Sequence, residues 1–250
     1  MKKGLIILLV IGLAACLLVG CDAVTPPASE SESEGEGEGE TVDRVVLVEF
    51  FTVGCPDCIT AEPIIEGLAE EYDRTEMILV EERPWGTPVT QGANDRYKWY
   101  LPNAADRSTP NTCYNGSNQI VHKGSAIYTF KSPIRNELAK DSEISITVSR
   151  SDNNGTTTLT GKIKNLSNSA LDNLVINGMT FRDYSESGQR YLLKDIFKGV
   201  EEVGESLEAG AEQNFTFTLE DVQWESSDLH GVVFVQSSST KEVFQALYVE

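Results

Sequence analysis

Two cysteines separated by two residues, Cys55 and Cys58, lie between an apolar run and a helical pattern. The run covers residues 45–51 and the helical pattern begins at Ile59, which predicts a strand, a tight turn, the cysteine pair and a helix in that order. A thiolate at a helix N-terminus is stabilised by unpaired N–H groups and by the positive end of the helix dipole. The pair therefore indicates dithiol–disulfide chemistry, in which Cys55 attacks and Cys58 resolves the mixed disulfide.

Two other uses of the cysteine pair are a structural disulfide and half of a metal site. A four-residue ring constrains little of the unfolded chain, so it stabilises the fold weakly. Zinc would require two more ligands, and the chain has only two histidines, His122 and His230. We therefore predict a redox pair, with no metal and no cofactor.

The N-terminus is typical of an exported lipoprotein. Two lysines precede a leucine- and isoleucine-rich stretch, residues 5–19, which is too short to span a bilayer. The sequence that ends in Gly20 and Cys21 resembles a lipobox, which predicts a signal peptide over residues 1–21 and a lipid on Cys21; Cys16 is a rival position. A plain signal peptide and an uncleaved anchor remain alternatives. Each places the rest of the chain outside the cytoplasm, and the lipid would attach it to the cell membrane or the outer membrane.

Residues 22–41 are rich in serine, glycine and glutamate and have no apolar periodicity. Such a segment cannot bury enough apolar surface to fold, so we predict a disordered tether. The whole chain has a formal net charge of −19. Binding to nucleic acid requires clustered lysine and arginine, so the composition excludes nucleic acid as a partner and leaves the lipid as the contact with the membrane.

Residues 42–141 predict one domain with alternating strands and helices. A helix reaches about Tyr72 and a strand follows at residues 77–82. A helical pattern over residues 89–101, a hairpin turned at Asn115 and Gly116, and a last helix that starts at Ser132 and Pro133 complete the domain.

This order of elements resembles that of thioredoxin-like proteins, and four features coincide with it in position. The cysteine pair is one. A proline, Pro63, follows the second cysteine by five residues, and a carboxylate, Glu49, precedes the first by six. A β-branched residue precedes a proline at Thr109-Pro110. The resemblance implies an α/β thioredoxin-like domain.

The same resemblance implies roles for the matching residues. Glu49 would accept the proton of Cys58, and a cis Pro110 would expose the backbone of Thr109 to an extended substrate. Charge burial in an apolar strand is costly, so a buried Glu49 should have a raised pKa. The alternatives are a Glu49 that faces outward or pairs with a lysine, and a trans Pro110 in an ordinary turn.

The chain also departs from the thioredoxin pattern. Family members usually have Trp before the first cysteine and Gly-Pro between the two, whereas this chain has Val53-Gly54 and Pro56-Asp57. Asp57 places a negative charge beside the nucleophile and should raise the pKa of its thiol. We therefore expect a reductant or an isomerase rather than a strong oxidant.

Further residues allow two interpretations each. Cys113 is either a buried hydrophobe or a third redox cysteine. For His122 we expect a surface imidazole. Four aromatic residues fill the core or form a rim around the cysteine pair: Trp85, Tyr97, Trp99 and Tyr100.

Residues 142–250 contain short alternating runs separated by turn signals such as Asn153-Asn154-Gly155. Six or seven strands at this spacing predict an all-β immunoglobulin-like sandwich. This part lacks cysteine and has one histidine, so we expect a spacer or docking module and no second active site.

The segment from Val232 to Ala246 is similar to the signature of the twenty-eight-kilodalton outer-membrane-protein family. That family also opens with a strand like residues 47–52 followed by a cysteine pair. The resemblance covers Val42 to Glu250 and implies a lipid-anchored protein without a defined substrate.

The leading functional hypothesis is a membrane-tethered, extracytoplasmic thiol–disulfide oxidoreductase that acts on protein thiols and disulfides; its redox donor is unknown. The alternative is a surface binding or adhesion lipoprotein that uses the same domain as a scaffold. A third hypothesis is a copper chaperone that uses Cys55, Cys58 and Cys113.

Overall fold

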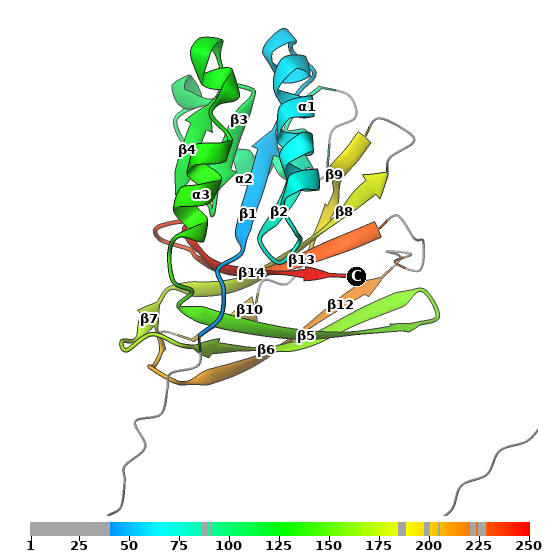
Figure 1. Ribbon diagram of the computed structural model, residues 1–250. Helices are drawn as coiled ribbons and strands as arrows, with labels where there is room; N and C mark the ends of the chain where they lie inside the picture. Colours follow the sequence, from blue (N-terminus) through cyan, green and yellow to red (C-terminus); the bar gives the residue numbers. More distant parts are fainter. Residues whose placement is uncertain are drawn as a thin grey trace, which may run out of the picture. The chain divides into compact units, whose positions relative to one another are not determined.

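A computed structural model describes residues 41–86, 90, 92–184, 189–197, 201–204, 206–220, 224 and 229–250 (Figure 1). The described residues belong to the second of the two units into which the chain divides, Gly39–Glu250. The expected signal peptide, the lipidation site at Cys21 and nearly all of the tether lie outside the described residues. Within the described ranges, no helix has the length and apolar character needed to cross a membrane.

The first half of the second unit alternates strands and helices in the expected order. Its elements are β1 (Val46–Phe51), α1 (Pro56–Glu71), β2 (Met77–Glu82), α2 (Ala93–Tyr100), β3 (Asn111–Tyr114), β4 (Asn118–Val121) and α3 (Lys131–Leu138), with two 3-10 helices, η1 (Ala104–Asp106) and η2 (Gly124–Tyr128). The hairpin turn has the positive φ angles expected of Asn115 and Gly116, 42° and 73°.

The second half consists of strands. They are β5 (Ile144–Asn153), β6 (Thr156–Asn165), β7 (Leu171–Asp172), β8 (Leu174–Tyr184), β9 (Gln189–Ile196), β10 (Glu201–Glu202), β11 (Ser206–Leu207), β12 (Glu212–Glu220), β13 (Leu229–Ser237) and β14 (Val243–Val249).

A single mixed sheet joins the two halves. Its order is β14-β13-β8-β9-β2-β1-β3-β4, with β10 paired to β8. The connection is a parallel pairing of β2 with β9, at Glu81 and Leu192. The predicted fold class, an α/β thioredoxin-like domain followed by an immunoglobulin-like sandwich, is therefore wrong: the chain is mostly β, and five strands of the expected sandwich region belong to the sheet that carries the helices. The domain boundary between residues 141 and 142 stays a prediction.

Strand β13 shows why the halves are joined. Its residues alternate between two hydrophobic cores, with Val232 and Phe234 in the core beneath the helices. Val233 and Val235 face the opposite core, which β5, β6 and β12 complete as a separate three-stranded sheet (Figure 1). A strand buried on both faces needs an uninterrupted apolar run, and this segment has one.

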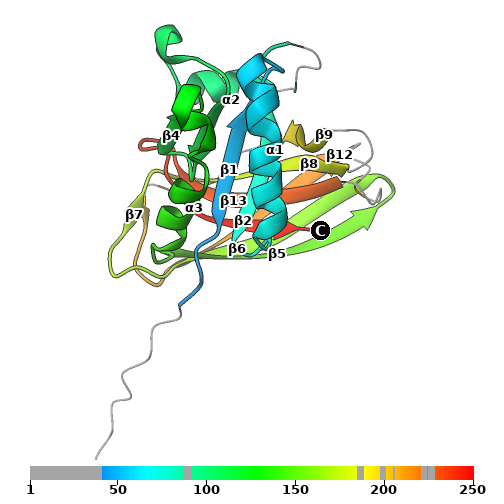
Figure 2. The ribbon, with the colours of Figure 1, turned by 45° about the horizontal axis from the view of Figure 1, so that its top comes forward.

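Helices cover both faces of the β1–β3 region, with α1 and α3 on one face and α2 on the other (Figure 2). Phe50 packs its ring edge against Phe130, which directly precedes α3, at a centroid distance of 6.1 Å. Phe51 packs against Tyr97 and Tyr100 of α2. Because side chains alternate along a strand, Glu49 shares the α2 face with Phe51.

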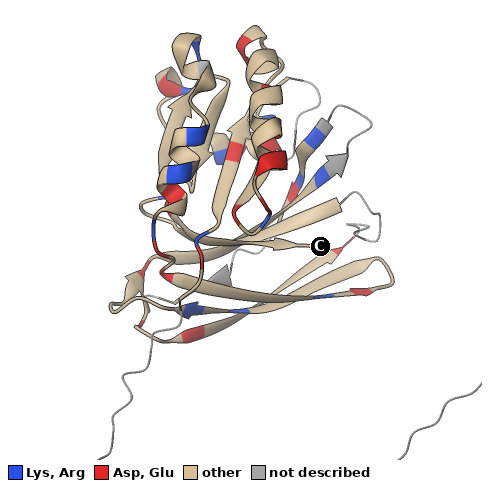
Figure 3. Ribbon diagram, viewed as in Figure 1, with Lys and Arg blue, Asp and Glu red and all other residues tan. Residues whose placement is uncertain are grey.

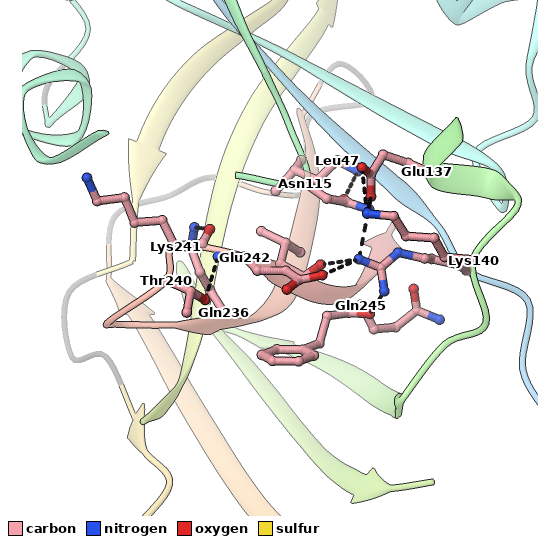
Figure 4. Close-up of polar contacts among 12 residues, drawn as sticks. Leu47, Asn115, Glu137, Lys140, Gln236, Thr240, Lys241, Glu242 and Gln245 are labelled. Carbon is pink, nitrogen blue, oxygen red and sulfur yellow. Dashed lines mark hydrogen bonds and ion pairs between the residues drawn. The ribbon is translucent and has the colours of Figure 1, made fainter. Parts of the chain in front are cut away.

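The β13–β14 hairpin docks onto the turn between β3 and β4 (Figure 4). The N–H of Val243 donates to the carbonyl of Asn115 at 3.0 Å, and Leu47 donates to the Asn115 side-chain oxygen at 2.8 Å. A methyl group at Gly116 would lie 1.9 Å from the Lys241 carbonyl oxygen. Only glycine permits this close approach, so the turn sequence fixes where the hairpin sits.

A buried arginine fastens the same hairpin to α3. Arg44 donates to the carbonyl of Val243 at 2.9 Å and lies 3.6 Å from the carboxylate of Glu137. Lys140 donates to both oxygens of Glu137, at 2.8 and 2.9 Å (Figure 4). The start of β1, the end of α3 and the C-terminal hairpin are thus joined by one set of ionic contacts.

Candidate active site: the Cys55–Cys58 disulfide

The two cysteines form a disulfide at the N-terminus of α1, with their Cα atoms 4.8 Å apart. Cys55 is the N-cap, and its Sγ accepts a hydrogen bond from the Cys58 N–H at 3.2 Å. Pro56 takes the first helical position, where its missing N–H is not needed. Cys55 is half-buried and Cys58 is fully buried, so the sulfur that an incoming thiol can reach is that of Cys55.

The Thr109-Pro110 segment lies against this sulfur. The peptide bond between the two residues is cis, as predicted. The Thr109 carbonyl oxygen is 3.7 Å from Cys55 Sγ, and Pro110 is buried. The carbonyl of Pro110 accepts from the N–H of His122 at 3.0 Å. Two predicted site elements, far apart in sequence, are therefore in contact.

Helix α2 holds the residue that precedes Thr109. The hydroxyl of Tyr97 donates to the Ser108 carbonyl at 2.6 Å and accepts from the Ser108 N–H at 2.8 Å. Its ring packs on Phe51 at 4.7 Å and on Trp85 at 5.3 Å. Burial raises the pKa of Tyr97, so the hydroxyl keeps the proton that it donates.

The surface beside the disulfide is apolar with an acidic border. Ile59 is 64% exposed and Trp85 is 38% exposed, and a methyl group at Gly86 would lie 3.9 Å from the side chain of Val53, two residues before Cys55. Helix α1 carries five carboxylates and no basic residue (Figure 3): Asp57, Glu62, Glu66, Glu70 and Glu71. Of the aromatic residues that had two interpretations, Tyr97 and Tyr100 are buried, Trp99 is partly buried and Trp85 is exposed.

Glu49 is buried but does not meet the cysteine pair in any described contact. Both carboxylate oxygens accept from the guanidinium of Arg96, with the Nη2–Oε2 bond at 2.8 Å, and the Tyr100 hydroxyl donates at 2.5 Å. The expected alternatives of an outward orientation or a lysine partner are both wrong. The role of Glu49 as proton acceptor for Cys58 stays a prediction.

Cys113 pairs with Glu49 in the register of β1 and β3. It is free, fully buried, and packed with Phe51, Tyr97 and Tyr100. Burial and the neighbouring Glu49 charge raise the pKa of the Cys113 thiol well above its usual value. The structure therefore favours a neutral, inert thiol, and a third redox role stays a prediction.

Glu82 lies beside the Glu49–Arg96 pair and was not singled out by the sequence. It is fully buried, and neither carboxyl oxygen has a hydrogen-bond partner within the described residues. Burial and the charge of Glu49 raise the pKa of Glu82 well above its usual value. Arg96 thus lies within ion-pair distance of both acids: it is hydrogen-bonded to Glu49 and its Nε is 3.9 Å from Glu82 Oε1.

His122 is buried, so the expected surface position is wrong. Its ring stacks on Phe130 at a centroid distance of 3.7 Å, and its Nδ1 lies 3.0 Å from the Ala126 carbonyl oxygen. Burial lowers the pKa of His122. His122 therefore packs as a neutral ring against an aromatic ring. The sequence pattern of β4 and the turn that follows it did not indicate that this histidine is buried.

Among the described residues, no cluster of three or more histidine, cysteine, aspartate or glutamate side chains is arranged to hold a metal ion. Cys113 lies with the aromatic residues of α2, whereas Cys55 and Cys58 lie at the N-terminus of α1. The three cysteines are therefore not gathered into one described site.

No family model and no curated protein matches this sequence. Solved structures similar to it include HBP35 of Porphyromonas gingivalis, with a TM-score of 0.66 and 11% identity over 83% of this chain and 75% of that one. Protein AGR_C_4864 from Agrobacterium tumefaciens gives a TM-score of 0.52 and 14% identity over 84% of this chain and 95% of that one. At such identities the likeness shows the fold alone.

A domain of the outer membrane lipoprotein Omp28 from Porphyromonas gingivalis is also similar, with a TM-score of 0.33 and 16% identity over 44% of this chain and 88% of that domain. This covers less than half of the chain and carries no argument.

Proposed function

We propose that the protein is an extracytoplasmic thiol–disulfide oxidoreductase that acts on protein cysteines through Cys55 and Cys58. The observation that carries the proposal is the disulfide at the start of α1, whose accessible sulfur lies beside the Thr109 carbonyl. The dipole and free N–H groups of that helix end stabilise a thiolate there. The proposal also includes a lipid on Cys21 that holds the protein at the membrane.

The reduced enzyme would transfer two electrons to a substrate disulfide. The Cys55 thiolate attacks one substrate sulfur, so the substrate S–S bond breaks, a mixed disulfide forms and the first substrate thiolate leaves. Cys58 loses its proton to a base and attacks Cys55 Sγ, which forms the Cys55–Cys58 disulfide and releases the second substrate thiolate. A dithiol protein then returns two electrons to the enzyme. With a substrate dithiol the same steps run in reverse.

Two carboxylates are candidates for the base. Glu49 is the predicted one, but its described contacts are to Arg96 and Tyr100. Glu62 lies four residues after Cys58 on α1 and accepts from the Thr52 hydroxyl at 2.5 Å. The rate at which the mixed disulfide is resolved can be measured against pH for Glu49→Gln and Glu62→Gln. The base is the residue whose substitution removes the increase in this rate with rising pH.

The decisive experiment is turnover of a peptide disulfide and of insulin by the full chain. Cys55→Ser should abolish turnover, whereas Cys58→Ser should accumulate a mixed disulfide between Cys55 and the substrate. Cys113→Ser is the matched control and should keep full turnover. Equal turnover by the wild-type protein and Cys55→Ser would refute the proposal.

The rival hypothesis, a binding or adhesion lipoprotein, predicts that neither cysteine of the pair is needed for function. A partner protein would then bind equally well to the wild-type chain and to the Cys55→Ser and Cys58→Ser variants.

For the membrane anchor, Cys21→Ala should move the protein from the membrane fraction to the soluble fraction. Membrane retention of that variant would refute the lipid anchor and leave the redox proposal intact.

A further inference from the structure

A second hollow lies away from the disulfide, on the α2 face of the large sheet. Its volume is about 500 Å³, and helix α2 and strands β8, β9 and β13 all contribute to its walls. This volume is in the range of cavities that bind small organic molecules. The residues that matter for its chemistry are Asp95, Arg96, Trp99, Asp195, Ile196 and Phe197.

The walls of this cavity are mostly apolar. Trp99 and Phe197 supply aromatic rings, and Ile196 and Val175 supply aliphatic surface. Gly92 closes the end next to α2, where a methyl group would lie 3.0 Å from Ile196. Because these side chains come from a helix and from two strands of the sheet, the apolar walls are supported by regular structure and suit a ring-shaped ligand.

One buried cation lines the cavity, and its charge is already matched. The Arg96 side chain is 9% exposed, and its Nε and Nη2 atoms bond to Glu49, Tyr100 and Gln236. In the described part of the chain, no hydrogen bond is assigned to its Nη1. This group can therefore donate to a neutral oxygen of a ligand, while the carboxylate of Glu49 balances the guanidinium charge.

Two carboxylates, Asp95 and Asp195, also line the wall. Asp195 is half-buried, and its side chain accepts from the Ile196 N–H at 2.9 Å, which fixes its orientation. Asp95 is 90% exposed and lies 3.8 Å from Lys98. A charged hydrogen bond to a cation stabilises a partly buried carboxylate more than an exposed one. Asp195 should therefore bind a cationic ligand more strongly than Asp95.

We infer that this cavity binds a small organic cation with an apolar ring and a protonated amine. The ring lies against Trp99 and Phe197; the Trp99 ring already contacts Arg96 and Lys241, at 5.8 and 5.7 Å, so the carboxylate of Asp195 and not an aromatic face selects the cation. The amine faces Asp195, and an oxygen acceptor on the ligand accepts from Arg96 Nη1. The inference is independent of the redox proposal because the cavity and the cysteine pair share no residue.

The test uses three probes that share a phenethyl group and differ in the charge of the head group: phenethylamine, phenethyl alcohol and hydrocinnamate. Titration calorimetry on the full chain should show the amine binding about tenfold more tightly than the alcohol, as expected for a hydrogen bond to a charged group. Hydrocinnamate should bind more weakly than the alcohol. Phenylalaninamide, which adds a carbonyl oxygen to the amine, should bind more tightly than phenethylamine.

Variants connect the selectivity to the cavity. Asp195→Asn should reduce amine binding to the level of the alcohol and leave alcohol binding unchanged, and Asp95→Asn should have a smaller effect. Asp172→Asn, an exposed aspartate outside the cavity, is the matched control and should change nothing. Val175→Phe, which fills the cavity, should abolish binding of every probe at an unchanged unfolding midpoint.

Three results would overturn the inference. One is equal or tighter binding of hydrocinnamate than of phenethylamine. The second is unchanged amine binding in Asp195→Asn. The third is the absence of binding by all four probes at millimolar concentration.

Discussion

The two faces of the β1–β3 region differ in what stabilises them: apolar packing on one face and buried ion pairs on the other. On the α1 and α3 face, Phe50, Ile65 and Phe130 form an apolar core, and the disulfide lies at its edge. On the α2 face, buried charges replace much of that packing, with Glu49 bound to Arg96. Glu49 and Phe50 are adjacent in sequence, so a single strand separates the two environments.

The difference between the faces explains how one sheet supports two kinds of site. Apolar packing fixes the position of α1, and the disulfide at the start of that helix supplies the reactive groups of that face. The charged face instead depends on ion pairing, since a buried charge without a partner is strongly unfavourable. The two faces should therefore respond differently to substitution and to pH.

Loss of the buried cation should have the largest effect. Arg96→Met leaves the Glu49 carboxylate buried and uncompensated, so we expect the free energy of unfolding to fall by about 3–5 kcal/mol. Urea denaturation measures it, and the double variant Arg96→Met, Glu49→Gln should recover much of the loss. Arg135→Met, at an exposed position on α3, is the control. A loss below that of the control would show that the ion pair does not stabilise this face.

On the apolar face, Ile65→Ala should lower the free energy of unfolding by about 2–4 kcal/mol, because it leaves a cavity in a core where Ile65 is fully buried. No titrating group is removed, so the loss should be the same at acidic and at neutral pH. A loss that varies with pH would contradict the proposed difference between the faces.

Glu82→Gln should increase stability at neutral pH. The pKa of Glu82 is raised in the folded protein, so between the unfolded and the folded pKa the unfolded chain releases a proton that the folded chain retains. Stability is thus lost as pH rises above the ordinary glutamate pKa, and the variant removes that loss. We expect a gain of about 1–2 kcal/mol at pH ~7, shrinking as the pH falls towards ~4.5.

The control for this substitution is Glu220→Gln, which alters an exposed glutamate on β12. Thermal or urea unfolding over a pH series measures both variants. A gain that persists unchanged in acid would mean that ionisation of Glu82 is not its source.

The smallest effect concerns Asp57, which is half-buried in the first turn of α1. Asp57→Asn removes a negative charge beside Cys55 and should lower the pKa of the reduced Cys55 thiol by less than about 1 unit. The pH dependence of iodoacetamide alkylation measures this shift, with Glu71→Gln at the far end of the helix as the control. An upward shift would contradict the expected electrostatic effect.

Local features of the site could be predicted from the sequence. Spacing alone placed Cys55 at a helix start, and Thr109-Pro110 is cis as the resemblance implied. The turn at Asn115 and Gly116 was predictable because few other residues accept its backbone angles. Each of these depends on residues close together in the chain or on a resemblance that fixes their spacing.

Long-range pairing was missed. The sequence does not encode locally that β9 lies beside β2, and this pairing joined the two expected domains into one sheet. A signal existed in the uninterrupted apolar run of β13, which indicates burial on both faces rather than the one-sided alternation of a sandwich strand. A buried Glu49 likewise demanded a cation, but only the packing of α2 selects Arg96.

The last residues of the chain complete a cluster that the first half begins. The Gln236 side chain donates to the Tyr100 hydroxyl at 2.8 Å, and Lys241 donates to the Tyr100 carbonyl at 3.0 Å. During synthesis, residues 42–141 emerge from the ribosome before these partners do. Until the β13–β14 hairpin docks, the charged α2 face is therefore still open to water.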